Sequence, residues 1–328
     1  MSAPSPVALA YFGKLASRGD FVRSAGHDAL TRLLDLWVSR ALERVAGDPR
    51  WKQRYDRVGA CRFAFLGVRS PVALAGHLVP SADASGRRFP FVVAGSFDVA
   101  APLEFVARAP LALGGLWPRL EAATREACGA ADAAAPLARA AQAGLEVDTG
   151  AASHAADFDG FLAEQTVGGL EGALRAAHPG LRLRETVMAV GLLLQPVPGS
   201  GASTLARGIA LPLPDDPLAA PLVGAFWTSL VAPFLAGGDF ELALFVLRPR
   251  PGAGSCLRIG FAGGDPQALQ AVFDHDADAA FVDASEAGWV DAHLEDDHAM
   301  RKLATYLAQP RLSLRQAMST FKECFLGE

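Results

Sequence analysis

The order of predicted elements in the first hundred residues constrains the fold more than any other feature of the chain. Residues 24–46 carry apolar side chains at helical spacing, and a Gly and a Pro follow them and end the helix. Apolar runs then occupy 61–68, 72–79 and 88–97, and their short connections suit antiparallel neighbours. The pattern predicts one helix followed by an antiparallel meander, with Pro90 favouring an edge position or a strand start.

The rest of the chain contains apolar residues both at helical spacing and in strand-like runs. Helices are predicted at 155–177, 218–236 and 264–273 and as two closing helices, residues 102–145 lean helical, and strands are predicted at 241–248 and 256–262. The run 186–194 is either a buried strand or part of a helix, and its β-branched residues and the Pro196 that follows favour a strand. In the last helix, Ser313 and Gln316 are predicted to form a capping box. Residues 195–221 are rich in Pro and Gly, which predicts a long, flexible surface insertion.

Composition excludes several classes of protein. With 328 residues, 51% of them hydrophobic, the chain is neither disordered nor collagen-like. Its four cysteines are far apart and indicate no zinc site or disulfide framework. The sequence shows no signal peptide and no apolar run long enough for a membrane span, which predicts a cytoplasmic protein without direct membrane insertion. The arginine excess accompanies an alanine excess typical of a GC-rich genome, so we expect no nucleic-acid partner.

The net charge of −5 hides an asymmetry between two parts of the chain. Residues 1–100 carry 14 basic and 8 acidic side chains, whereas the remainder carries 16 basic and 27 acidic ones. Such a split indicates partner surfaces or solubility and does not indicate a fold.

Known catalytic and nucleotide-binding motifs are absent from the sequence. It has no P-loop, no GxGxxG after a strand and no GxSxG, so no cofactor is predicted. Residues 265–297 are acidic and contain interleaved histidines, but their spacing matches no metal motif, and we interpret them as solvated surface. A metal-dependent hydrolase that uses this region is the alternative. Its carboxylates are Asp265, Asp274, Asp276, Asp278, Asp283, Glu286, Asp291, Glu295, Asp296 and Asp297.

Two predicted loop segments contain glycines next to charged residues. Residues 11–22 place Lys14 and Arg18 between two glycines, and residues 81–91 form a turn that contains Asp83. The simplest interpretation of both is loop architecture, in which Arg18 or Arg87 pairs with Asp20 or Asp83.

The same two segments resemble motifs of the TagF (ImpM) family of type VI secretion-associated proteins. The pattern G-K-x-P-x-x-G-D-F is matched by Gly13, Lys14, Gly19, Asp20 and Phe21, with Ala16 in the place of Pro. The pattern P-S-x-D-x-x-G-R-x-F-P is matched by Pro80, Ser81, Asp83, Gly86, Arg87, Phe89 and Pro90. The resemblance covers 11–98 well and becomes weaker beyond it, where 261–273 is similar to a late helix start of the family.

The resemblance implies a fold. We expect an α/β protein with three α/β/α layers, a largely antiparallel but mixed sheet and a longin- or profilin-like N-terminal core. Residues 1–115 would form this core, and 116–328 would pack on the same sheet.

It also implies a function, namely a non-catalytic cytoplasmic repressor that acts after translation on a type VI secretion system by binding its forkhead-associated scaffold protein. No metal or cofactor is expected. The basic N-terminal part would then meet an acidic partner face, and 265–297 would keep the protein soluble. A longin-type module that regulates GTPases is a further alternative. The candidate partner-binding or motif residues are Gly13, Lys14, Arg18, Gly19, Asp20, Phe21, Ser81, Asp83, Gly86, Arg87, Phe89 and Pro90.

Overall fold

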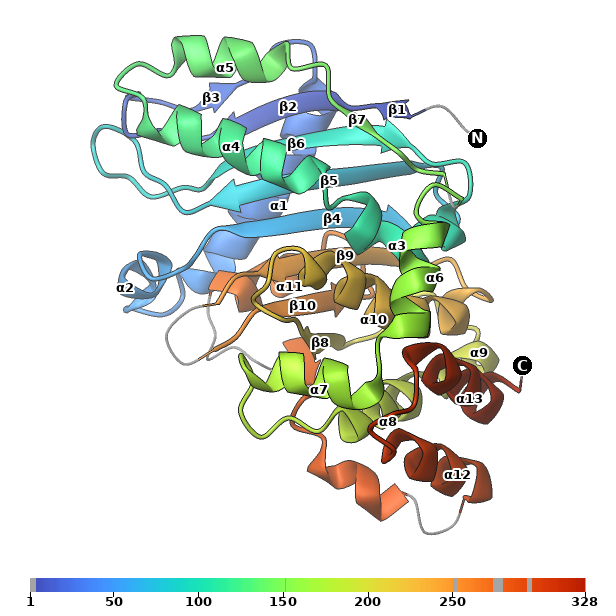
Figure 1. Ribbon diagram of the computed structural model, residues 1–328. Coiled ribbons are helices and arrows are strands. Elements are labelled where there is room, and N and C mark those ends of the chain that lie inside the picture. The colour runs from blue at the N-terminus through green and yellow to red at the C-terminus, as the bar shows by residue number, and fades with distance from the viewer. Residues whose placement is uncertain (1–3, 151, 250–252, 274–279, 294–296, 328) are drawn as a thin grey trace.

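A computed structural model describes residues 4–150, 152–249, 253–273, 280–293 and 297–327, and within them a mixed sheet of nine strands runs through the molecule (Figure 1). Its strands are β2 (Ala8–Gly13), β3 (Val22–Arg23), β4 (Cys61–Gly67), β5 (Val72–Val79), β6 (Phe91–Asp98), β8 (Gly208–Pro212), β9 (Glu241–Leu247), β10 (Cys256–Gly260) and β11 (Phe281–Asp283). Their order across the sheet is β11-β8-β10-β9-β4-β5-β6-β2-β3. The β11 and β8 strands pair in parallel, and the other neighbours pair antiparallel. A separate pair, β1 (Ser5–Pro6) and β7 (Glu146–Val147), lies beside β6.

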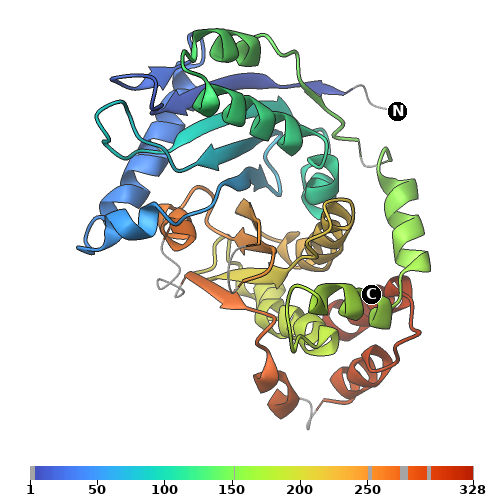
Figure 2. The same ribbon diagram turned by 60° about the vertical axis from the view of Figure 1, so that its left-hand side comes forward.

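Helices cover both faces of the sheet, as Figure 2 shows from the side. They are α1 (Asp28–Val45), α2 (Trp51–Tyr55), α3 (Pro102–Ala112), α4 (Leu116–Gly129), α5 (Ala134–Ala141), α6 (Ala155–Glu164), α7 (Val167–Arg175), α8 (Leu183–Leu194), α9 (Val197–Ser200), α10 (Ala219–Leu235), α11 (Pro266–Phe273), the 3₁₀ helix η2 (Gly288–His293), α12 (His298–Leu307) and α13 (Leu314–Leu326). Helices α1 and α11 bury their apolar sides on one face. Helices α3, α4 and α10 cover the other face, and α8 and α13 extend that apolar layer. The predicted α/β sandwich with a mixed sheet is confirmed.

The predicted meander is also confirmed. Strands β4, β5 and β6 are consecutive antiparallel neighbours, with Arg62 opposite His77 and Val79 opposite Phe91. Pro90 stands immediately before β6, where its missing amide hydrogen breaks no ladder bond. Strands β8, β9 and β10, from much later in the chain, continue the same sheet beyond β4.

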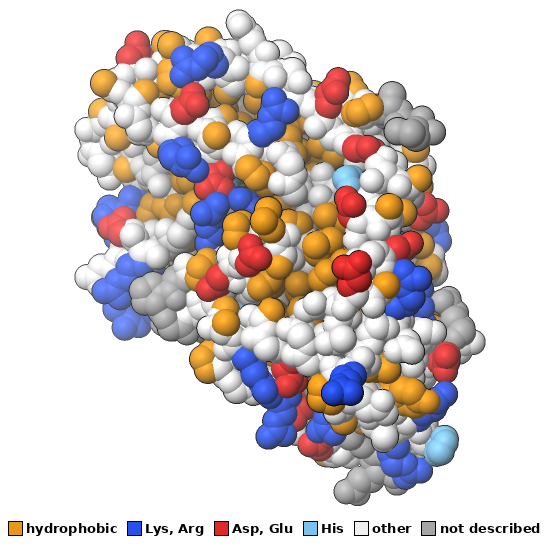
Figure 3. Space-filling view, in the orientation of Figure 1, with side chains coloured by type: hydrophobic (Ala, Val, Ile, Leu, Met, Phe, Trp, Pro, Cys, Tyr) orange, Lys and Arg blue, Asp and Glu red, His pale blue; other side chains and the backbone are white. Residues whose placement is uncertain are grey.

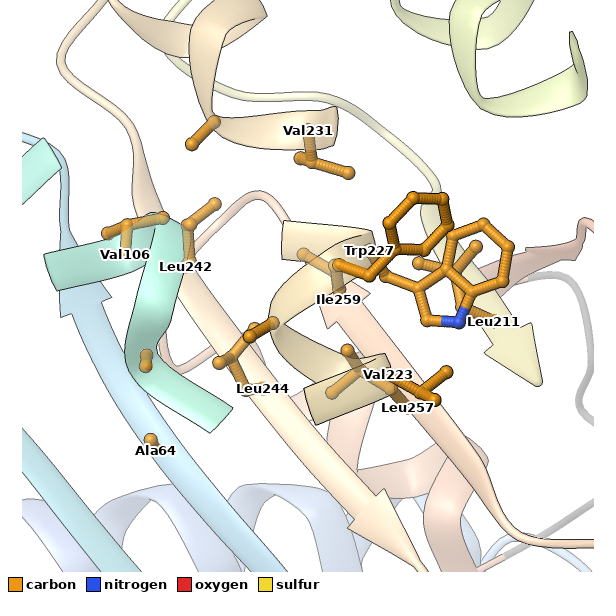
Figure 4. Packing of buried hydrophobic residues seen from close by; sticks show 14 of the residues in the cluster. Ala64, Val106, Leu211, Val223, Trp227, Val231, Leu242, Leu244, Leu257 and Ile259 are labelled. Atoms are coloured by element: carbon orange, nitrogen blue, oxygen red, sulfur yellow. The ribbon is translucent and has the colours of Figure 1, made fainter. Parts of the chain in front are cut away.

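Close packing of α10 on the sheet forms part of the main hydrophobic core (Figure 4). Trp227 of α10 is fully buried, and its indole nitrogen donates a hydrogen bond of 2.8 Å to the carbonyl oxygen of Pro212. Leu244 and Ile259 lie below it on β9 and β10. Helix α3 approaches α10 at Gly224, where a Cβ atom would lie 2.7 Å from the Cβ atom of Pro110. A glycine at this position therefore lets the two helices touch.

Three predicted elements differ from the structure. Residues 186–194, predicted as a strand, belong to α8, which is buried on nearly all sides and therefore shows no clear helical period. The predicted helix 155–177 is two helices, α6 and α7, because the Thr166 hydroxyl accepts from the Gly169 amide and starts a new helix. The prediction of a flexible surface insertion at 195–221 is wrong for the middle of this segment, since β8 is fully buried and pairs with both β10 and β11.

The closing helix α13 begins with the predicted capping box, in which Ser313 accepts from the Gln316 amide and Gln316 accepts from the Ser313 amide. None of the helices in the described parts of the chain is both long enough and apolar enough to cross a lipid bilayer.

Candidate partner-binding surface

A buried carboxylate joins the two motif segments. Asp83 has no exposed side-chain surface, and its Oδ2 atom lies 3.0 Å from Lys14 Nζ and 2.7 Å from Arg87 Nε. Its Oδ1 atom accepts hydrogen bonds from the amide and hydroxyl of Ser85, at 3.0 and 2.8 Å, and from the Arg87 amide, at 3.0 Å. Burial by itself would raise the pKa of Asp83, but these hydrogen bonds and the two cations hold it well below its usual range. Asp83 is therefore ionised at neutral pH and fully partnered.

Two glycines give the loops their shape. Gly13 has a φ of 133°, and a Cβ atom there would collide with the carbonyl oxygen of Pro90, the residue just before the neighbouring strand β6. Gly86 has a φ of 78°, in the left-handed region, and faces open space. The first glycine is required by close approach between β2 and β6, whereas the second is required only by the turn.

Aromatic rings cover the Lys14 side chain. The Lys14 Nζ atom lies 4.9 Å from the centre of the Phe21 ring, within the range of a cation–π interaction. Phe21 stacks on Phe12 at 5.4 Å and meets Phe89 edge-on at 4.8 Å. Phe12 and Phe89 are buried, but Phe21 is 42% exposed. The motif phenylalanines thus form a cluster in which one ring faces outward.

Further hydrogen bonds connect the two loops and hold the second one to the helices. Arg87 Nη2 donates to the carbonyl oxygen of Gly19 at 2.8 Å, and the Ala84 amide donates to that of Arg18 at 2.8 Å. The carbonyl oxygen of Ser81 accepts from the buried hydroxyl of Tyr55 at 3.0 Å.

The predicted ion pairs form only in part. Arg87 pairs with Asp83, as the architectural interpretation of the loops predicts. Arg18 instead reaches Asp132, just before α5, with 2.7 Å between Arg18 Nη2 and Asp132 Oδ1. The Asp20 carboxylate accepts from the Phe21 amide at 2.8 Å and shapes its own turn. The predicted site residues therefore lie together, but most of them are occupied in holding the loops.

On the outside of this buried framework, the exposed parts of Phe21, Arg18, Arg87 and Asp20 form what we call the motif surface. The side chains of Arg18 and Arg87 are 41% and 61% exposed, although each already has a carboxylate partner. Aromatic and arginine side chains of this kind are the residues that contribute most to protein–protein binding.

A second charged cluster lies on the other side of the sheet and was not predicted. Glu121 of α4 accepts from Arg62 at 3.0 Å, from Arg248 at 2.7 Å and from Arg125 at 3.1 Å. His77 is buried next to this cluster, and its pKa is lowered to about 4, mainly because burial disfavours the charged imidazolium. From the sequence, only the ion pair between Glu121 and Arg125 could be predicted, because the two residues are four apart on a helix. The two other arginines come from β4 and from the residue after β9.

The acidic region gives no metal centre in the part that the structure describes. There, no three His, Cys, Asp or Glu side chains gather as a group of metal ligands. Asp291 pairs with Arg184, with 2.8 Å between their charged atoms, and Asp283 accepts from Ser285. Asp265 and Asp297 accept hydrogen bonds from backbone amides at helix starts. Five further carboxylates of the alternative, Asp274, Asp276, Asp278, Glu295 and Asp296, lie outside the described residues, as does His275.

A cavity of about 490 Å³ beside β8 and β10 has a histidine at its rim. The Nε2 atom of His178 lies 3.0 Å from the carbonyl oxygen of Leu213 and 2.9 Å from that of Ser255. A nitrogen between two carbonyl oxygens must carry a hydrogen and donate it, so this atom is held in a structural role.

Comparison with known proteins agrees with the family resemblance of the two motifs. The model of the TagF N-terminal domain, described as type VI secretion system-associated, matches residues 10–143 and so includes both motifs. A search of curated proteins found no match. Among solved structures, the PA0076 protein of Pseudomonas aeruginosa PAO1, determined at 2.05 Å, is 26% identical over 41% of this chain and 61% of its own. Its TM-score of 0.33 is too low to establish a common fold. On the evidence of the domain match and the two motifs, residues 10–143 are a TagF N-terminal domain, which is described as type VI secretion system-associated.

Proposed function

We propose that this protein is a non-catalytic, cytoplasmic regulator that represses a type VI secretion system by binding the system's forkhead-associated scaffold protein. The observation that carries the proposal is the buried Asp83 framework, which fixes both family motifs side by side and leaves Phe21 and Arg87 facing outward. A surface fixed in this way loses little conformational entropy when a partner binds.

The chemistry of the motif surface favours an acidic partner. Arg18 and Arg87 are exposed there, and Arg23 lies exposed on β3, close to Phe21 in the chain. Positive charge on such a surface accelerates the encounter with an acidic partner and discriminates against basic ones. Phe21 supplies the apolar contact that charges alone lack.

Binding to purified scaffold protein by titration calorimetry tests the proposal. We expect wild-type protein to bind and Phe21→Ser and Arg18→Ala to weaken binding by about tenfold or more, as hot-spot residues do. Arg119→Ala, which removes an exposed arginine from α4, is the matched control and leaves binding unchanged. Absence of binding by the wild-type protein overturns the proposal.

The variants also separate binding from folding. Phe21→Ser and Arg18→Ala leave Asp83 with its two cations, so both are expected to fold and to melt cooperatively. If they fold and still bind with wild-type affinity, the motif surface is not the interface, and the motifs serve the architecture of the loops alone.

A further inference from the structure

A groove of about 450 Å³ lies between α3, α6, α10 and α13, on the face of the sheet that is opposite α1. Most of its lining is apolar and includes Phe158, Leu162 and Met318. Figure 3, which faces α3, α6 and α10, shows hydrophobic side chains gathered in the middle of this face between charged ones. The volume is typical of a site that takes a ligand or several side chains of a partner.

Arg108 of α3 lines this groove and forms no ion pair with a carboxylate among the described residues. Its guanidinium carbon lies 4.2 Å above the centre of the Phe158 ring, and its Nη1 atom is buried without a hydrogen bond among the described residues. Burial lowers the pKa of Arg108, although Asp159 and Glu104 oppose this effect from a distance. A partly desolvated guanidinium with an unused donor is costly, and the cost falls when an anionic oxygen binds the guanidinium.

The other charges of the groove define its occupant further. Lys322 of α13 also lines it, and Glu104 and Asp159 stand at the same groove. The structure gives none of these three side chains an ion pair within its described parts. The two carboxylates would repel a polyacidic segment, whereas the apolar lining and Arg108 suit an apolar segment with a single carboxylate.

We infer that this groove is a second docking site, which binds an apolar peptide segment of a partner protein through one carboxylate placed on Arg108. Its lining comes from α3, α6, α10 and α13 and shares no residue with the motif surface, so neither site needs the other. The inference goes beyond the proposed function and does not depend on the forkhead-associated scaffold.

Stability and peptide binding together test this site. Arg108→Met keeps an unbranched side chain on the Phe158 ring but removes the buried charge. We expect the melting temperature of the full-length protein to stay the same or to rise. In the free protein the buried charge of Arg108 costs desolvation free energy, and on this inference its role is to bind a partner. A clear fall in melting temperature would mean that Arg108 stabilises the fold, and would overturn the inference.

The binding arm uses a library of short, fluorescently labelled apolar peptides that differ only in a central Glu, Gln or Lys. The best Glu peptides are expected to bind the wild-type protein at least about tenfold more tightly than their Gln counterparts in anisotropy titrations. Arg108→Met should abolish this preference, and Arg119→Met, the matched surface control, should retain it. Equal affinity for Glu and Gln peptides, or no binding by any member, overturns the inference.

Discussion

The Nζ atom of Lys14 lies 3.0 Å from the Oδ2 atom of Asp83, and 8% and 0% of the two side chains are exposed. This pair joins the end of β2 to the turn between β5 and β6, and thus one family motif to the other. A charge that is buried with its partner becomes strongly unfavourable when the partner is removed. The pair therefore makes the two loops one structural unit.

Asp83→Asn is expected to lower the melting temperature at pH 7, because Lys14 and Arg87 lose their common carboxylate. The pKa of Asp83 is depressed in the folded protein, so its contribution to stability is complete above the unfolded pKa of about 4 and is lost as the pH falls further. Thermal melts of wild type and variant should therefore differ most at neutral pH and converge below about pH 4. A constant difference across this range would contradict the assignment.

Phe89→Ala is expected to destabilise the protein by about 3–5 kcal/mol, since Phe89 is buried and its ring supports both Phe12 and Phe21. Phe21→Ala should cost only about 1 kcal/mol, because much of that ring is already exposed. Urea unfolding followed by tryptophan fluorescence measures both values. Equal losses would show that the outward ring is as important for folding as the buried one.

Gly13 and Gly86 offer a matched pair of backbone tests. Gly86→Ala should cost about 1–2 kcal/mol, the strain of a left-handed alanine, because the site is open. Gly13→Ala adds a collision with the Pro90 carbonyl oxygen and should be clearly more destabilising, to the point of lost expression. Circular dichroism melts compare the two, and a smaller loss at Gly13 would argue against the close contact of β2 with β6.

His77 is expected to make the protein less stable in mild acid. Because its pKa falls from about 6.5 unfolded to about 4 folded, the unfolded chain binds more protons between these values. Stability should decline by about 3 kcal/mol as the pH falls through that window. His77→Leu should remove this part of the decline, while the effect of Asp83 below about pH 4 remains. A variant with the wild-type pH profile would contradict the prediction.

Binding of the scaffold protein at the motif surface is expected to weaken as salt rises from low to physiological concentration, because exposed charges are screened over about 10 Å at 0.1 M. Arg18→Ala should reduce the salt dependence as well as the affinity. Salt-independent binding by the wild-type protein would exclude an electrostatic motif surface, even if the complex forms.

The sequence by itself determined the elements whose signals are local. The period of α1, the short turns of the β4–β6 meander and the capping box of α13 each depend on residues close together in the chain. The two motifs also mark the loops and most of the residues that meet at Asp83.

Only the tertiary structure decided which distant groups pair. It placed β8 in the sheet and paired Arg18 with Asp132 instead of Asp20. It also brought Arg62 and Arg248 into ion pairs with Glu121. It also made 186–194 a helix, since a segment buried all round carries no period to distinguish it from a strand. The physical reason is common to these cases. The spacing of apolar residues along a segment shows which side of that segment is buried. Strand partners and ion pairs depend instead on which distant surfaces the folded chain brings together.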